Sequence, residues 1–83
     1  MKAILTRYHG ATNFKGSRVS ATADGWGRVY VSYDHALNSD GVHEKAARAL
    51  LRRVEDRGGY VSAQANLIGG GLPNGDMAWV FVG

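Results

Sequence analysis

Residues 38–59 read NSDGVHEKAARALLRRVEDRGG, and this stretch predicts the one helix of the chain. Between residues 42 and 54 the apolar side chains recur every three or four positions, which is the spacing of a single helical stripe. Gly58-Gly59 is a typical helix end. The stretch therefore predicts an amphipathic helix over about residues 40–57 that can cover one face of a small sheet. Its start is signalled but not fixed, because three good N-cap residues occur in a row: Asn38, Ser39 and Asp40.

Upstream of the helix, residues 17–33 predict a β-hairpin. Residues 17–23 and 28–33 both alternate polar and apolar side chains, which is the pattern of a half-buried strand. Asp24-Gly25 marks a tight reversal between them, because both residue types tolerate the positive φ of hairpin turns. The hairpin then has one apolar face and one polar face. The polar face carries Arg18, Ser20, Thr22, Arg28 and Tyr30.

The remaining segments complete a sheet. Residues 2–8 read as a first strand, residues 60–68 as extended structure, and residues 69–75 (GGGLPNG) as a flexible loop. The last segment, residues 77–83 (MAWVFVG), is an apolar strand. The predicted order is β-β-β-α-β-β, so we expect residues 1–83 to form a single α+β domain with a mainly antiparallel five-stranded sheet and one helix on one face.

The last strand is apolar on both of its sides, which raises the question of what covers each side. Met77, Trp79 and Phe81 share one side, and the other side has only alanine and valine. We expect the bulky trio to pack under the alanine-rich helix. If it faced outward instead, leaving Trp79 and Phe81 in water would forfeit roughly 3–6 kcal/mol. Either arrangement leaves apolar surface uncovered, which favours a homodimer or a partner-binding face, unless the sheet curls and closes on itself.

The size and the charge of the chain also favour association with a partner. A chain of 83 residues without cysteine has a small core and no disulfide to reinforce it, so association is its usual support. The absence of cysteine, of a signal peptide and of a membrane-spanning run is what a cytoplasmic protein would show. The net charge is +3, and residues 1–28 hold five basic residues against one acidic residue. This excess could attract phosphates or an acidic protein surface, although it could equally serve solubility.

The polar side of the hairpin is the best candidate for binding. Arginine beside an aromatic ring on a sheet can stack bases and hold phosphates. We expect Arg18, Arg28 and Tyr30 to lie on the sheet, with Arg7 and Lys15 near its edge. The alternative is a solvated face whose arginines keep edge strands from pairing promiscuously.

No pattern of catalytic or metal-ligating residues emerges. His9, His35 and His43 fall at a strand end, in a loop and in a first helical turn, without tight ligand spacing, so we interpret them as surface or capping histidines. A Ser-His-Asp set can be written around His35, but no nucleophile elbow is present. The GGGLPNG loop precedes a strand rather than the helix that a phosphate loop needs. We therefore expect no enzyme, no metal and no cofactor.

Five short motifs are spread along the chain: Thr6-Arg7-Tyr8-x-Gly10-x-Thr12, Gly16-Ser17-Arg18-Val19-x-Ala21, Tyr33-Asp34-His35-Ala36-Leu37, His43-x-x-Ala46-Ala47-x-Ala49-Leu50 and Gly69-Gly70-Gly71. With these motifs the chain resembles a family of small, mostly uncharacterised proteins from phages, plasmids and proteobacterial genomic islands. The similarity spans nearly the whole chain, and the segment 56–66 (DRGGYVSAQAN) is longer than in that family. The resemblance carries no activity; it implies a mobile-element context, in which small proteins often antagonise host defence, CRISPR systems included.

These observations favour a non-enzymatic binding protein of a phage or mobile element that inhibits a host defence complex, such as a CRISPR effector, in the host cytoplasm. A basic chain cannot imitate DNA, so it would block an acidic protein surface, compete for nucleic acid or hold moving subunits apart. One alternative is a nucleic-acid-binding regulator that uses the basic sheet face. Another is a structural or virion component.

Overall fold

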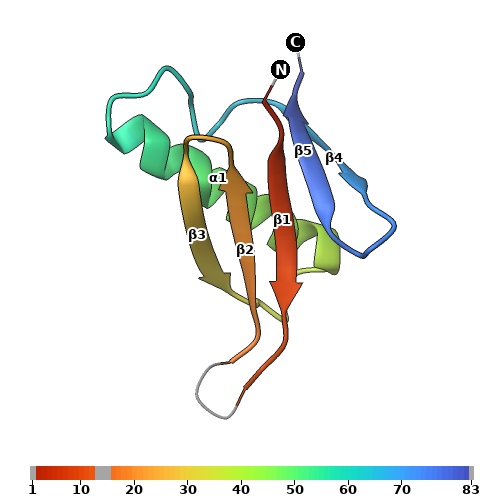
Figure 1. Ribbon diagram of the computed structural model, residues 1–83. Helices are drawn as coiled ribbons and strands as arrows, with labels where there is room; N and C mark the ends of the chain where they lie inside the picture. Colours follow the sequence, from red (N-terminus) through yellow and green to blue (C-terminus); the bar gives the residue numbers. More distant parts are fainter. Residues whose placement is uncertain (1, 13–15, 83) are drawn as a thin grey trace.

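A computed structural model describes residues 2–12 and 16–82, which form an antiparallel five-stranded sheet and one helix (Figure 1). The predicted α+β fold and the order β-β-β-α-β-β are confirmed. In space the strands lie in the order β3-β2-β1-β5-β4, so the first and last strands of the chain are neighbours at the centre. The elements are β1 (Ile4–His9), β2 (Arg18–Ala23), β3 (Gly27–Ser32), α1 (Ser39–Asp56), β4 (Leu67–Gly71) and β5 (Met77–Phe81).

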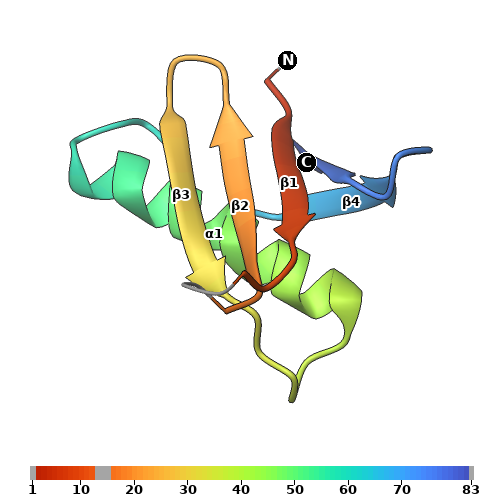
Figure 2. The same ribbon diagram turned by 60° about the horizontal axis from the view of Figure 1, so that its bottom comes forward.

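Helix α1 crosses one side of the sheet, behind β1, β2 and β3 (Figure 2). Asn38 is its N-cap, since the Asn38 side chain accepts a hydrogen bond from the backbone N–H of Gly41 at 2.7 Å. The structure thus selects the first of the three possible caps. The apolar stripe faces the sheet, as predicted. Its buried members are Val42, Ala46, Ala47, Leu50, Leu51 and Val54.

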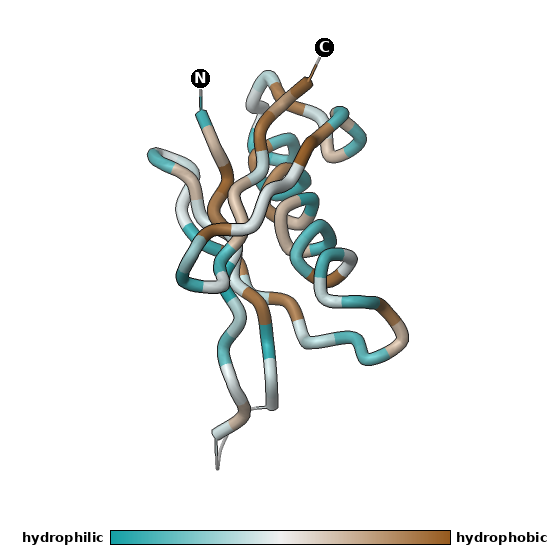
Figure 3. Tube along the Cα trace, turned by 90° about the vertical axis from the view of Figure 1, so that its right-hand side faces the viewer, coloured by the Kyte–Doolittle hydropathy of each residue, from teal (hydrophilic) through white to brown (hydrophobic). Residues whose placement is uncertain are grey.

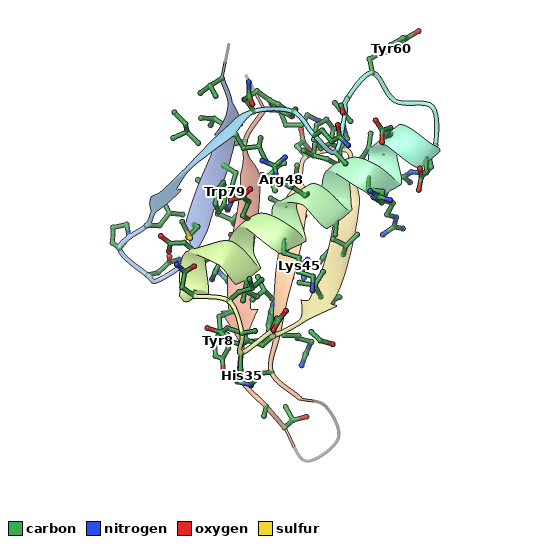
Figure 4. All side chains as sticks on the ribbon, turned by 180° about the vertical axis from the view of Figure 1, so that it is seen from behind. Tyr8, His35, Lys45, Arg48, Tyr60 and Trp79 are labelled. Carbon is green, nitrogen blue, oxygen red and sulfur yellow. The ribbon has the colours of Figure 1, made fainter. Side chains whose placement is uncertain are left out.

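The core lies between α1 and the sheet. The apolar side of β2 meets the helix through Val19, Ala21 and Ala23, and Ile4 of β1 joins them. From β5, Met77 and Trp79 are buried, with Trp79 only 5% exposed (Figure 4). Phe81 is partly buried and packs edge-on against Trp26, with ring centroids 6.3 Å apart; the bulky trio therefore lies under the helix, as expected.

The triple glycine corrects one prediction. Residues 69–71 were expected in a flexible loop, but they belong to β4 and pair with β5, while the segment before Leu67 is not a strand. Gly69 lies directly against the Trp79 ring, where an added Cβ would come within 2.6 Å of ring carbons. Close approach to Trp79, rather than flexibility, explains this glycine.

Arg48 fastens the segment between α1 and β4 to the helix. Arg48 Nε donates to Glu44 Oε2 at 2.8 Å, and Arg48 Nη1 donates to the carbonyls of Ala63 and Ala65 at 2.9 Å each. Ala63 is thereby held against the core. Among the described residues, no helix is long and apolar enough to cross a membrane.

Candidate binding surface

In the part of the chain that the structure describes, no element covers the side of the sheet opposite α1, and we call this side the open face. The strand register places alternate residues of all five strands on it. Strands β1 to β3 contribute mainly polar and basic side chains, and β5 and β4 contribute aliphatic ones. Figure 3 shows the backbone from the β4–β5 side, with α1 on one side of the strands. The side chains of the open face come from Leu5, Arg7, His9, Arg18, Ser20, Thr22, Arg28, Tyr30, Ser32, Ile68, Ala78 and Val80.

Arg7 lies at the centre of the open face and not near its edge, because β1 is the middle strand. Arg7 Nε and Nη2 each lie 3.0 Å from Asp76 Oδ2. Asp76 is only 6% exposed, and Asn74 bonds to it as well. Hydrogen bonding to Asp76, and then the charge of Asp76, raise the pKa of Arg7. Arg7 is therefore a fixed cation that is already paired. Asp76 was not among the residues predicted for the site; the signal present in the sequence was a carboxylate placed just before an apolar strand.

Arg18 and Tyr30 form a cation–π pair. The Arg18 guanidinium carbon lies 5.4 Å from the centroid of the Tyr30 ring. Tyr30 is 52% exposed, so the ring keeps contact surface free for a ligand or partner. Arg18 Nη1 is buried without a hydrogen-bond partner among the described residues. The predicted proximity of these two residues is thus found, with one guanidinium nitrogen left unsatisfied.

His9 lies among the arginines of the open face, a position that the sequence analysis did not anticipate. Its Nε2 is 2.9 Å from Ser20 Oγ, and its ring centroid is 5.6 Å from that of Tyr30. Burial lowers the pKa of His9, and the charges of Arg18, Arg7 and Arg28 lower it further, against a small opposing effect of Asp76. The imidazole is therefore neutral at neutral pH. The available sequence signal was the alternation that puts residues 5, 7 and 9 on one side of β1.

A hollow of about 110 Å³ opens between these side chains, and we call it the basic hollow. Ser20 and Thr22 of β2 are short and form its floor, because longer side chains flank them on β1 and β3. Arg28 lines it and makes no ion pair with any described residue. Lys15, the remaining predicted binding residue, lies outside the described residues. The lining residues are Leu5, Arg7, His9, Ser20, Thr22 and Arg28.

The apolar surface that β4 and β5 present on the open face is aliphatic. Because Met77 and Trp79 are enclosed beneath α1 and Phe81 is partly buried there, the trio is not an exposed interface. The opposite side of β5 continues into β4, whose Ile68 is 59% exposed. We call this surface the aliphatic strip. It consists of Leu5, Ile68, Ala78, Val80 and Val82.

The other two histidines lie on the helix side of the sheet. His43 is only 3% exposed, and its Nδ1 lies 2.7 Å from Thr6 Oγ1, which also accepts a hydrogen bond from Trp79 Nε1–H at 3.1 Å. Burial lowers the pKa of His43, against the charges of Asp40 and Asp76. His43 is thus a core residue and not a surface or capping one.

His35 is exposed and packs on Tyr33, with ring centroids 5.1 Å apart. A cleft of about 410 Å³ runs past His35, Tyr33, Tyr8 and His43 at the end of the sheet where α1 begins (Figure 4). In the part of the chain that the structure describes, no three His, Cys, Asp or Glu side chains are grouped so as to hold a metal ion.

Comparisons with protein-family models, with curated proteins and with solved structures found no match to this chain.

Proposed function

We propose that this chain is a small non-enzymatic binding protein that acts by occupying a site on another macromolecule with the open face of its sheet. The observation that carries this proposal is the asymmetry of the two sides. Helix α1 covers one side, whereas the other presents arginines and a half-exposed tyrosine next to the aliphatic strip. The resemblance to mobile-element proteins suggests the setting, which is inhibition of a host defence complex inside the host cell.

The composition of the open face suits a protein partner. Arginine and tyrosine are enriched among the residues that dominate binding energy, and apolar surface beside them can be desolvated on contact. Arg7 is already neutralised by Asp76, so the attraction for an acidic partner comes chiefly from Arg28 and Arg18. An acidic surface on the partner would be drawn to these charges and positioned by them.

A direct test is affinity capture from the native host followed by mass spectrometry, combined with plaque assays on defence-positive strains. The test variant is Arg28→Ala with Tyr30→Ala, which removes exposed side chains of the open face. Its matched control is Arg52→Ala with Tyr60→Ala, which removes the same two residue types from α1 and the segment after it (Figure 4). We expect the control to recover a defence protein and rescue phage growth, and the test variant to do neither. Equal recovery by both variants, or no recovery by the wild type, would contradict the proposal.

A second candidate is a single-strand nucleic-acid binder, which the Arg18–Tyr30 pair favours. An exposed ring with a guanidinium over it can stack a base while the arginines contact phosphates. Binding would then weaken steeply with salt, with a log–log slope of about −0.7 per phosphate neutralised on single strands. A flat salt response would remove this candidate and leave the protein-binding proposal intact.

A further inference from the structure

We propose that the basic hollow is a preformed site for one tetrahedral oxyanion, a phosphate group, and that His9 takes up a proton when the anion binds. This inference rests on the proposed function, because it names the chemistry that the open face recognises.

Donors converge on the hollow from three strands. Arg28 of β3 brings a guanidinium that is unpaired among the described residues, and Arg7 of β1 keeps donors that do not point to Asp76. Ser20 of β2 supplies a hydroxyl from the floor, whereas the Thr22 hydroxyl already donates to the Gly27 carbonyl at 3.0 Å. Donors that approach from several directions suit a tetrahedral anion, and guanidinium groups match the oxygens of phosphate.

The charges around the hollow leave room for an anion. Arg7, Arg18 and Arg28 all lie close enough to His9 to affect its ionisation, and among the described residues Asp76 is the one carboxylate that acts on it. The negative charge of Asp76 is already paired with the Arg7 guanidinium. The free protein therefore holds an excess of positive charge here, and this excess adds to the effect of burial in disfavouring a proton on His9. A bound dianion would outweigh this positive charge and thereby favour protonation of His9.

Protonation of His9 reverses the direction of its hydrogen bond with Ser20. In the neutral tautomer that carries its proton on Nδ1, which is the one that our proposal requires, His9 Nε2 accepts from Ser20 O–H over 2.9 Å and occupies the only proton of that hydroxyl. Once His9 is protonated, Nε2–H must donate to Ser20 Oγ, because imidazolium has no acceptor. The Ser20 O–H is then released to donate to the anion. One proton thus adds both a charge and a hydrogen-bond donor to the site.

The occupancy of the hollow can be tested by NMR titration of the protein with inorganic phosphate. We expect chemical-shift changes centred on residues 7, 9, 20 and 28. Arg28→Met should weaken the apparent affinity about tenfold, the usual loss for one charge-assisted hydrogen bond. The control Arg52→Met removes the same charge from α1 and should leave the affinity within about twofold. Equal weakening by both variants, or shifts that avoid the hollow, would overturn the proposal.

The coupling to His9 needs a probe whose own charge is constant, and inorganic sulfate remains a dianion across the relevant pH range. Sulfate affinity should rise as the pH falls from about 8 to about 5, by about tenfold for each unit by which the anion raises the pKa of His9. His9→Gln keeps a polar group near Ser20 and cannot titrate, so its sulfate affinity should not change with pH. A pH dependence that survives in His9→Gln would assign the proton to another group and overturn the coupling.

The source of the phosphate is settled by a parallel titration with a short single-stranded oligothymidine. Much tighter binding than that of inorganic phosphate, lost in Arg28→Met, would identify a nucleic-acid backbone. Equal affinity would identify a small phosphorylated molecule. Absence of binding by phosphate, sulfate and oligothymidine would refute the oxyanion site, whereas the capture experiment would still judge the proposed function independently.

Discussion

At the scale of single residues, two small residues, Thr6 and Gly69, determine how the Trp79 ring is accommodated in the core. The Thr6 hydroxyl lies between β1 and α1 and joins His43 to Trp79, so one oxygen satisfies two buried ring nitrogens. Gly69 is the counterpart of Trp79 on β4, because only hydrogen fits beneath that ring. Neither role could be predicted from the sequence, since both depend on which residues become neighbours across strands.

Thr6→Val should destabilise the fold although the two side chains have nearly the same shape. The change leaves Trp79 Nε1–H and His43 Nδ1 without the oxygen they share, and each unsatisfied buried group costs about 1–3 kcal/mol. The free energy of unfolding in urea measures this loss. Thr22→Val serves as the control, since the Thr22 hydroxyl bond to Gly27 is exposed. An equal loss in both variants would show that the buried network contributes nothing particular.

Gly69→Ala should lower the free energy of unfolding by about 1–3 kcal/mol, the usual cost of overpacking. The added methyl group would meet the Trp79 ring at 2.6 Å, so the ring or the strand must move. Gly70→Ala on the same strand is the control, because nothing lies within 4 Å of its added Cβ. A stable Gly69→Ala protein with unchanged tryptophan fluorescence would contradict the close approach.

The stability of the protein should fall as the pH is lowered through the ordinary range of histidine. Burial lowers the pKa of His43 in the folded state, so the unfolded chain binds the proton more readily. The contribution is fully present above the unfolded pKa of about 6.5 and is lost as the pH falls from there toward the folded pKa. Urea unfolding at several pH values should show a shallower pH slope for His43→Gln, and His9→Gln isolates the similar contribution of His9. An unchanged slope in both variants would assign the effect elsewhere.

At the scale of elements, strict alternation and helical periodicity were sufficient for β2, β3 and α1. Their polar and apolar sides fall where the pattern predicted, because burial on one side leaves each residue only two choices. The fourth strand was predicted over residues 60–68 with residues 69–71 in a loop, whereas β4 spans Leu67–Gly71. The glycines were misassigned because they carry no alternation and the ring that Gly69 accommodates is distant in the sequence. The position of Arg7 at the sheet centre was also not predicted, because the pattern of residues within one strand does not show which strands are its neighbours.

Arg48→Met should loosen the segment between α1 and β4. The methionine keeps most of the apolar stem but cannot bond the Ala63 and Ala65 carbonyls or Glu44. We expect faster hydrogen exchange over residues 58–66 and a cost of about 1–3 kcal/mol, the typical range when charge-assisted hydrogen bonds are lost. Arg52→Met, one turn further along α1, should leave the exchange unchanged. Protection that persists in Arg48→Met would mean that packing alone holds the segment.

At the scale of the whole molecule, no element within residues 2–12 and 16–82 covers the aliphatic strip, because the single helix lies on the other side of the sheet. A second copy is the simplest cover, and we expect a homodimer in solution. Ile68→Lys should shift the sedimentation equilibrium toward the monomer without loss of the fold, because Ile68 is 59% exposed. The control is Leu37→Lys, an exposed apolar residue before α1 and outside the strip. A wild-type protein that sediments as a monomer at all concentrations would exclude self-association through the strip.

The pairing of β1 with β5 also limits the order in which the strands can pair during folding. Hairpins β2–β3 and β4–β5 need only their own turns, but β1 cannot gain its second neighbour until β5 has left the ribosome. Until β5 pairs with β1, Trp79 Nε1–H lacks the Thr6 hydroxyl as its acceptor. The nascent β1 then has one unpaired strand edge, with which another chain could pair. The pairing of β1 with β5 is therefore also the event that encloses Trp79, the largest side chain of the core, so a chain that has not yet made this pairing leaves the indole uncovered.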